Sequence, residues 1–404
     1  MINSGDTAFV IVCAALVCLM TPGLAFFYGG LVSRKNVLTI MMQSFVSMGV
    51  VTIIWFLFGF SLTFGPDVHG IIGGLKYLCL NGVGMTPNPR YGATIPFITF
   101  FSYQQMFAII TPALITGAFA DRVNFKSYLV FLIAWSILIY IPLAHWVWGG
   151  GFLQQMGVVD FAGGIVVHAS AGLAALASVF FVGKRKLISK ADLEPHNITH
   201  VALGTALLWF GWFGFNAGGG LAADSLASIA FINTDISASV AMVTWLVISW
   251  IKEKKPSFVG ILTGSVAGLA TITPAAGFVE PWAAALIGLA AGAVCYYAVQ
   301  FRQKVDWDDA LDVWGVHGVG GILGSILVGV FAVKSVNGVD GLIYGDFHQF
   351  GIQLFATIFA SVYAFVVTYM ILKVINCFMP VRVSEEEEKM GLDISIHREE
   401  AYHI

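Results

Sequence analysis

The chain has 404 residues, of which 58% are hydrophobic and only 11% are charged. A soluble domain carries about 25% charged residues, so this composition excludes an ordinary water-soluble fold and indicates a polytopic membrane protein. The net charge of −3 argues against a basic nucleic-acid-binding surface, and the five scattered cysteines support neither a zinc site nor a disulfide framework.

Apolar runs of about 20 residues, the length that a helix needs to cross a bilayer, recur along the whole chain. No Lys or Arg precedes the first run, so it lacks the basic start of a signal peptide and is expected to stay in the mature protein. The sequence predicts an all-α membrane protein with eleven transmembrane helices, near residues 8–32, 38–65, 95–120, 127–148, 160–182, 199–221, 226–251, 257–279, 281–301, 312–333 and 350–373.

Basic residues gather in alternate connections between these spans. Of the 20 Lys and Arg residues, only Lys76, Arg90 and Lys334 fall in the opposite set of connections. Because basic residues concentrate on the cytoplasmic side, the N-terminus is predicted outside and the C-terminus in the cytoplasm of a multi-pass protein of the cell membrane. Residues 1–380 then form the transmembrane domain, and residues 381–404 form a cytoplasmic tail.

The seventh span contains a polar cluster, Asn233-Thr234-Asp235. An ionisable residue inside a span is a candidate for a functional role in a pore. We interpret the cluster instead as interrupting or capping a helix.

Two segments share a pattern in which an Asp precedes a His by eight residues and small residues follow. Asp160 precedes His168 at the fifth span, and Asp309 precedes His317 at the tenth. Five spans reverse the direction of crossing, so this spacing predicts inverted repeats of spans 1–5 and 6–10. The repeat halves would be about 1–185 and 196–335, with the last span, at about 347–375, outside them. The repeat axis would bring the two histidines to equivalent depths.

His168 and His317 are the two histidines that lie deep inside spans. Each could simply bond to a neighbouring helix. Alternatively, two neutral imidazoles can pair, with one ring donating an N–H and the other accepting it. Such a pair can hydrogen-bond a small polar solute or relay a proton. Charging both rings would place like charges together in a low dielectric, so at least one ring is expected to stay neutral.

The two aspartates and several aromatic residues complete the candidate site. A carboxylate at a helix start can accept backbone N–H groups, so we assign Asp160 and its pseudo-symmetric counterpart Asp309 a structural and electrostatic role. Phe107, Trp148 and Phe215 stand near the outer ends of spans. Most Trp and Tyr residues at that depth are membrane-belt residues, but aromatic faces also stabilise a small cation, by about 2 kcal/mol once it is desolvated.

Several longer motifs resemble those of the Amt/Mep/Rh ammonium transporters, most closely the microbial Amt branch, along essentially the full chain. These motifs are residues 22–30 (PGLAFFYGG) with 34–36 (RKN), 141–145 (IPLAH) with 148–151 (WGGG), 160–164 (DFAGG) with 167–168 (VH), 211–218 (GWFGFNAG), 312–320 (DVWGVHGVG) and 383–393 (VSEEEEKMGLD). The resemblance implies an ammonium transporter, not an enzyme, without a cofactor or metal, and a homotrimer with one pore per subunit.

The resemblance also implies roles for single residues. Phe107 and Trp148 would recruit ammonium at the outer side, with Asp160 in support and Tyr103 as a further aromatic of the vestibule. Phe107 and Phe215 would form a hydrophobic gate. His168 and His317 would line the pore.

Position 219 departs from the resembled pattern. Many relatives have a Ser there, whose hydroxyl bonds the cation, whereas this chain has Gly219 between two further glycines. We therefore expect a weaker outer site, or one that uses water or a carbonyl group.

The acidic run Glu385 to Glu388 opens the tail and reads, on its own, as a solvated helix start. The resemblance implies a regulatory tail that docks a PII-type (GlnK-like) signalling protein. An ammonium sensor with low conduction is the alternative function. An intramembrane hydrolase is disfavoured, because no metal-ligand triad or Ser nucleophile motif is present.

Overall fold

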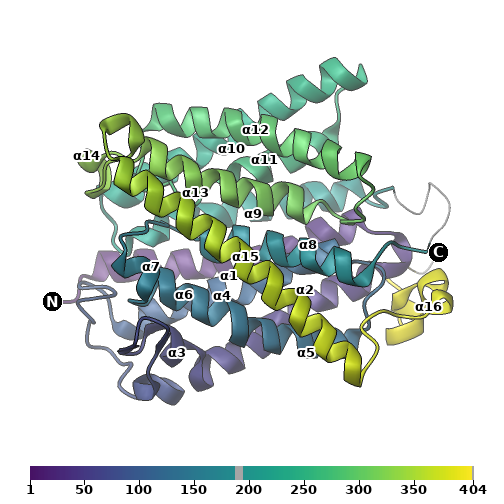
Figure 1. The fold of residues 1–404 in the computed structure, drawn as a ribbon, viewed down its shortest axis with the longest axis horizontal. Coiled ribbons are helices and arrows are strands. Elements are labelled where there is room, and N and C mark those ends of the chain that lie inside the picture. The colour runs from purple at the N-terminus through teal and green to yellow at the C-terminus, as the bar shows by residue number, and fades with distance from the viewer. Residues whose placement is uncertain (187–193, 403–404) are drawn as a thin grey trace.

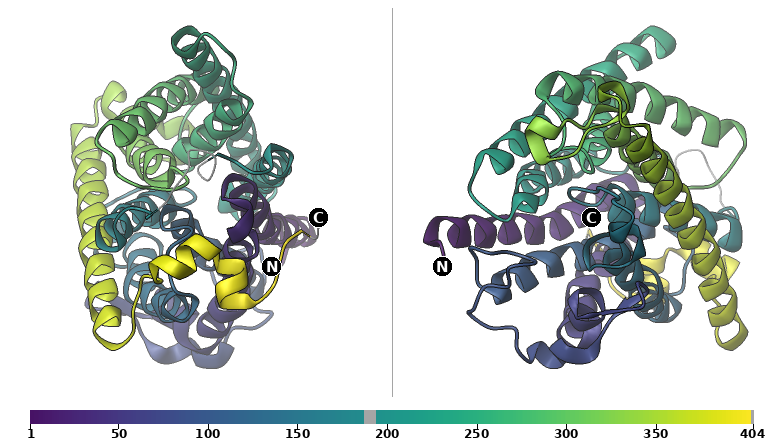
Figure 2. Two further views of the ribbon diagram at one scale, coloured as in Figure 1. Left: turned by 90° about the vertical axis from the view of Figure 1, so that its right-hand side faces the viewer. Right: turned by 60° about the vertical axis from the view of Figure 1, so that its left-hand side comes forward.

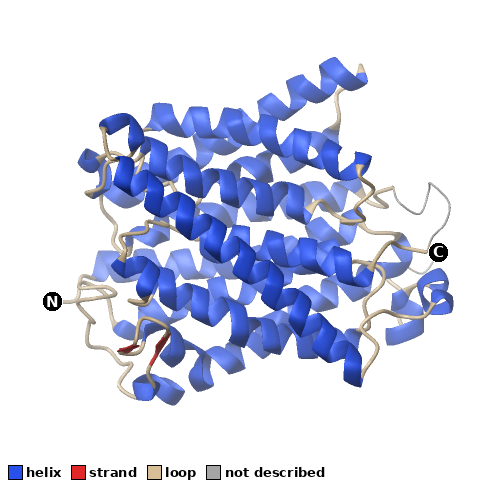
Figure 3. Cartoon of the chain, in the orientation of Figure 1, coloured by secondary structure: helices blue, strands red, loops and turns tan. Residues whose placement is uncertain are grey.

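The computed structural model describes residues 1–186 and 194–402 as a bundle of long, roughly parallel or antiparallel helices (Figures 1 and 3). The N-terminus and the C-terminal tail lie at opposite ends of the bundle (Figure 1). Lys190, one of the basic residues of the charge pattern, lies outside the described residues. The bundle consists of α1 (Ser4–Leu31), α2 (Val37–Ile54) with η2 (Trp55–Gly59) and α3 (Phe60–Phe64), α4 (Phe97–Ile115), α5 (Phe125–Trp135) with η5 (Ser136–Tyr140) and α6 (Ile141–Trp148), η6 (Gly164–Ala169) with α8 (Ser170–Val182), α9 (Ile198–Ala217), α10 (Ser225–Glu253), α11 (Phe258–Ile272), α12 (Pro281–Lys304), η9 (Trp314–Gly318) with α13 (Val319–Phe331), and α15 (Phe347–Phe378).

Short elements cap the two ends of the bundle. The end that carries the N-terminus has a small antiparallel hairpin, in which Asp67 of β1 (Asp67–Val68) pairs with Gly73 of β2 (Ile72–Gly73) (Figure 3). The end that carries the C-terminus holds the tail helices, which pack against the bundle (Figure 2). The remaining short elements are η1 (Arg34–Asn36), β1 (Asp67–Val68), β2 (Ile72–Gly73), η3 (Leu75–Leu80), η4 (Thr116–Ala118), α7 (Phe152–Gln155), η8 (Gly218–Gly220), α14 (Lys334–Asn337), η10 (Leu342–Tyr344), α16 (Glu385–Met390) and η11 (Asp393–His397).

The helix count is close to the eleven spans predicted. Ten helical segments of the described chain are long and apolar enough to cross a membrane, and α11 is a shorter apolar helix of 15 residues at the position of the eighth predicted span. Pro274 explains why α11 stops early, because proline has no N–H and its ring clashes with the preceding turn of a helix. The chain continues through buried turns over 273–279, where Ala275 and Phe278 still donate backbone hydrogen bonds. Such irregular backbone is tolerated at membrane depth only where protein surrounds it.

The prediction for the Asn233-Thr234-Asp235 cluster is wrong. Helix α10 runs without a break from Ser225 to Glu253, and its cap is Asp224, well before the cluster. The Asn233 amide donates instead to two carbonyl groups of the buried turns after α11, at 2.9 and 2.8 Å. Because the polar side chain bonds a neighbouring segment and not its own backbone, it does not end the helix. Asp235 lies half-buried on this helix.

Close helix packing depends on glycines at the crossings. Along the crossing of α1 with α9, a Cβ added at Gly204 would lie 2.2 Å from the backbone nitrogen of Phe27. Small residues allow such backbone approach where no hydrophobic effect drives helices together inside a bilayer. Helix α15 runs diagonally across α13, α8 and α5 and covers one side of the bundle (Figure 1). The centre of the bundle is thereby screened from lipid on that side.

Candidate substrate pathway

A cavity of about 260 Å³ opens near the end of the bundle that carries the N-terminus, and aromatic side chains dominate its walls. It is called the outer cavity here, after the predicted outside position of the N-terminus. The Trp148 indole stands at 86° to the Phe107 ring, with ring centroids 6.2 Å apart. Its Nε1–H donates to the backbone oxygen of Asp160 at 2.8 Å, which fixes the orientation of the indole. Tyr103 packs edge-on against Phe107 at 4.9 Å. The predicted recruitment residues therefore line one cavity.

The Asp160 carboxylate is buried and is fully engaged with backbone. One oxygen accepts from the amides of Gly163 and Gly164, and the other from those of Ile165 and Val166, at 2.7 to 3.2 Å. A carboxylate satisfies N–H groups that a helix start leaves without partners, and its charge strengthens those bonds. Asp160 therefore anchors the start of the helix that carries His168.

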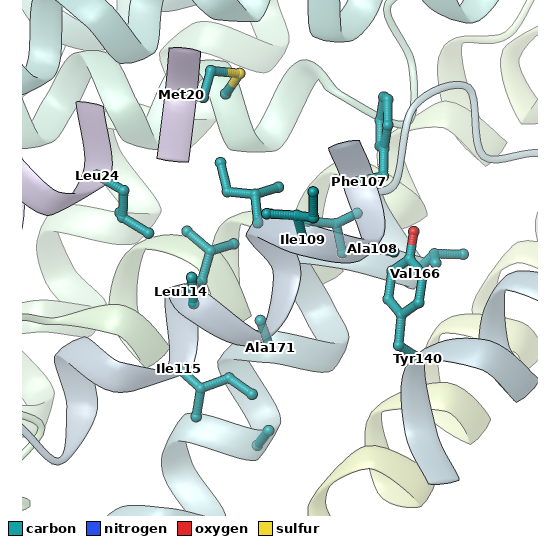
Figure 4. Close-up of a cluster of buried hydrophobic side chains, with 14 of the residues drawn as sticks. Met20, Leu24, Phe107, Ala108, Ile109, Leu114, Ile115, Tyr140, Val166 and Ala171 are labelled. Atoms are coloured by element: carbon teal, nitrogen blue, oxygen red, sulfur yellow. The ribbon is translucent and has the colours of Figure 1, made fainter. Parts of the chain in front are cut away.

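Two phenyl rings, tilted by 35° to one another, close the inner side of the outer cavity. The ring centroids of Phe107 and Phe215 are 4.2 Å apart, and both side chains are buried. The Tyr103 hydroxyl donates to the backbone oxygen of Phe215 at 2.6 Å and so ties α4 to α9 at this level. Figure 4 shows Phe107 on α4 beside the apolar side chains of the bundle centre. The pair separates the outer cavity from the space below it.

Below the phenyl rings, His168 and His317 lie in contact. Their Nδ1 atoms are 3.3 Å apart, and the rings are nearly parallel at 18°. Both nitrogens cannot donate, so one ring carries hydrogen on Nδ1 and the other on Nε2. The two outward Nε2 atoms then differ, because one is an acceptor and the other a donor. The Nε2 atom of His168 is buried and has no partner among the described residues.

The two histidines are brought together by similar local structures. Both lie in π-helical turns, η6 and η9, a feature common at functional sites. Asp309 accepts from the amides of Val313 and Trp314 at the start of η9, as Asp160 does before η6. The helices then touch at two glycines, since a Cβ on Gly172 would lie 2.0 Å from the Cα of Gly318.

A narrow cavity of about 10 Å³ lies along the imidazoles, close to the smallest space that holds one water molecule. Apart from the two histidines and Trp212, its walls are apolar, and they include Met20, Leu24 and Leu114 (Figure 4). His317 also lines an inner cavity of about 240 Å³, where Asp312 pairs with Arg302. The three cavities therefore follow one another through the bundle.

Trp212 belongs to the site but was not predicted. Its ring stacks on His168 with centroids 5.4 Å apart, and its Nε1–H donates to the Thr273 hydroxyl at 2.9 Å. The signal was present in the sequence, because Trp212 stands three residues before Phe215 and shares its helix face. Gly219 lies against Phe161, and a Cβ there would come within 3.0 Å of the Phe161 carbonyl oxygen.

The tail contacts the end of the bundle through specific bonds. Asp393 accepts from the amides of Leu38 and Thr39 and so caps helix α2, 354 residues from Thr39 along the chain. Glu388 is buried and pairs with Arg382 at 2.8 Å. The acidic run is thus not wholly solvated, although Glu385 is exposed and starts α16.

A buried charge network lies beside the tail. Asp308 contacts both Arg122, at 3.1 Å, and Arg185, at 2.7 Å. Burial alone would raise the pKa of Asp308, but these two cations lower it to about 2. Nearby, burial and the charge of Asp312 raise the pKa of Asp309 to about 6.

Comparisons with known proteins place the chain in one family. Residues 8–402 match the family model described as Ammonium Transporter Family. An ammonium transporter of Bacillus subtilis is 49% identical over 98% of both chains. The crystal structure of Saccharomyces cerevisiae Mep2 superposes with a TM-score of 0.89 and 34% identity, over 95% of this chain and 88% of that one. A structure titled Sensor Amt Protein gives a TM-score of 0.90 and 31% identity, over 97% and 98%.

The chain therefore belongs to the ammonium transporter family. It is a multi-pass membrane protein that transports ammonium and is not an enzyme.

Proposed function

We propose that this ammonium transporter binds NH4+ in the outer cavity, removes one proton there, and conducts NH3 past the phenyl pair and along the two imidazoles. The observation that carries the proposal is the contact between His168 and His317 in a narrow, otherwise apolar cavity directly below Phe215. A space of about 10 Å³ has no room for a hydrated ion.

Capture rests on the aromatic walls of the outer cavity. The faces of Phe107 and Trp148 attract a cation through their ring quadrupoles, by about 2 kcal/mol or more once water is removed. The bond from Trp148 to the Asp160 backbone holds the indole in place before the ion arrives. This attraction offsets part of the free-energy cost of removing water from NH4+ in the outer cavity.

Loss of the proton explains both passage and selectivity. A small ion buried without partners costs several kcal/mol even after relaxation, and NH3 escapes most of that cost. Ammonia both donates and accepts hydrogen bonds, which suits the unlike Nε2 atoms of the imidazole pair. Potassium has no proton to lose, so the same conduit rejects it. The released proton either crosses separately along the histidines or returns outside, and the two routes differ in net current.

Proteoliposomes that hold the purified protein test this proposal. We expect an ammonium-evoked current or alkalinisation that potassium does not evoke, and its loss when His168 and His317 are both replaced by Ala. The control His348→Ala removes an exposed imidazole at the start of α15 and is expected to leave the flux unchanged. Selective ammonium flux at the normal rate in the double variant would contradict the proposed pathway.

We further infer a homotrimer whose tail docks a PII-type protein at the cytoplasmic face. The support is the tail itself, which contacts the bundle through Asp393 and through Glu388, whose carboxylate accepts from the Lys186 backbone amide, while Glu385 and Glu386 remain exposed. Native mass spectrometry of the detergent-solubilised protein tests the trimer. Removal of residues 381–404 is expected to abolish binding of a PII protein, and retained binding would refute this role for the tail.

A second candidate function is an ammonium sensor that conducts little. The similarity to the Sensor Amt Protein structure favours it, as does Gly219, which offers the bound cation no hydroxyl. Flux decides between the two functions. Ammonium binding without current above protein-free liposomes would favour the sensor, and sustained selective flux would favour the transporter.

A further inference from the structure

Gln104 is a polar side chain of the outer cavity whose oxygen makes no hydrogen bond within the part of the chain that the structure describes. It lies on α4 next to Tyr103 and three residues before Phe107, and it lines the same cavity. Its side-chain oxygen is buried and lacks a hydrogen-bond partner among the described residues. Buried polar atoms in folded proteins almost always have a partner, in the protein or in a bound molecule. A molecule bound in the cavity that Gln104 lines is therefore the candidate partner of this oxygen.

The neighbouring residue shows that the absence of a partner is specific to Gln104. Gln105, on the same helix, donates from its amide to the Thr52 hydroxyl at 2.8 Å and does not line the cavity. The Gln104 amide can turn about its last torsion at little cost, since that torsion is broad. Such a rotation breaks no described hydrogen bond and presents the oxygen to the cavity.

A recruited ammonium ion needs hydrogen-bond acceptors. Of the amide side chains that line this cavity, Gln104, Gln154 and Asn337, only Gln104 has a buried oxygen without a partner among the described residues. NH4+ carries four donors and no acceptor, while the indole of Trp148 is a donor only. Both Asp160 oxygens are occupied by backbone amides, and the Tyr103 hydroxyl points its hydrogen at the Phe215 carbonyl. Gly219 contributes no side chain. The Gln104 oxygen is thus a side-chain acceptor that has no partner among the described residues and can bond an ion in the cavity.

The geometry points to Gln104 as the side chain that accepts a hydrogen bond from ammonium in the outer cavity and sets the affinity of that site. This inference rests on the proposed function, because it assigns one contact within the same recruitment site. It makes Gln104 a binding residue that acts together with the aromatic faces of Phe107 and Trp148.

Three variants test this inference in proteoliposomes. Gln104→Met keeps the length of the side chain and removes the acceptor, so KM for ammonium should rise about tenfold to a hundredfold, as expected for one bond to a charged group. The maximal current should stay near the wild-type value. Gln104→Glu restores an acceptor, so KM should be equal to or below that of the wild type. The control Gln105→Met should leave KM within about twofold, because its side chain does not reach the cavity.

Two results would overturn the inference. One is an unchanged KM in Gln104→Met, which would mean that water alone bonds the amide. The other is an equal loss of maximal current in Gln104→Met and Gln104→Glu, which would mean that the residue is only structural.

A binding assay separates this inference from the proposed function. Ammonium chloride should raise the thermal stability of the purified protein, and Gln104→Met should shift the half-maximal concentration by the same factor as KM. If the wild type binds ammonium but carries no flux, the proposed conduction is refuted. The shift in half-maximal ammonium concentration in Gln104→Met then still decides the role of Gln104. A wild type that ammonium does not stabilise, with no shift in any variant, would count against the contact itself.

Discussion

Replacing Asp160 by Asn tests how the carboxylate holds the start of the histidine-bearing helix. The change keeps the shape of the side chain but turns one acceptor oxygen into an N–H2 donor. Two of the four backbone amides, either those of Gly163 and Gly164 or those of Ile165 and Val166, then face a donor. A buried donor left unsatisfied costs about 1–3 kcal/mol, so the expected loss is about 2–6 kcal/mol. That is a large part of the 5–15 kcal/mol that typically stabilises a folded protein.

The pseudo-symmetric Asp309 supplies a matched control. Its two oxygens accept only one amide each, from Val313 and Trp314. Asp309→Asn therefore leaves a single N–H without an acceptor, and the expected loss is about 1–3 kcal/mol. The structure thus predicts that Asp160→Asn lowers the free energy of unfolding more than Asp309→Asn does, as well as the approximate size of each loss.

Thermal unfolding in detergent, followed by tryptophan fluorescence, measures both variants beside the wild type. Asp160→Asn is expected to unfold at the lower temperature of the two and to lose ammonium flux, because the segment that positions His168 loosens. Equal unfolding temperatures for Asp160→Asn and the wild type would refute the reasoning. A larger effect of Asp309→Asn than of Asp160→Asn would refute it as well.

Three further predictions concern other parts of the protein. Phe215→Ala removes one of the two phenyl rings that separate the cavities, so potassium current relative to ammonium current should rise in proteoliposomes; an unchanged ratio would exclude the ring as a barrier. Asp308→Asn leaves the buried Arg122 without a carboxylate, while Arg185 keeps its contact with Asp121, and the pKa of about 2 against 3.8 corresponds to about 2.5 kcal/mol. Because the folded-state pKa is lowered, this stabilisation is complete above pH 4 or so and is lost as pH falls to about 2, so the stability gap between wild type and variant should narrow over that window. Asp393→Ala removes the cap of α2 at a cost of about 0.5–2 kcal/mol. Limited proteolysis should then cut the tail roughly tenfold faster than in the wild type. An unchanged rate of cleavage would mean that the Asp393 cap does not hold the tail to the bundle.

The sequence predicted the features that depend on local composition and spacing. Apolar runs located the spans, because a helix in lipid satisfies its own backbone and needs only enough apolar length. The repeated Asp-to-His spacing singled out His168 and His317, whose nitrogens lie 3.3 Å apart in the structure. The early end of α11 could also have been read from Pro274. The error at Asn233 had a different origin, since its amide bonds turns that lie 43 and 46 residues away.

Only the tertiary structure decided the features that depend on contacts between distant segments. The sequence shows Gly172 and Gly318 as two glycines among 45, and the fold alone places their backbones close enough to join the histidine helices. In the sequence Asp393 is one of several acidic residues of the tail, and only the fold shows that it caps the start of α2. Gln104 and Gln105 are chemically alike and adjacent, yet one bonds Thr52 and the other lines the outer cavity. The physical reason is that hydrophobicity and length are properties of each segment by itself, whereas the partner of a hydrogen bond is supplied by whichever segment packs beside it.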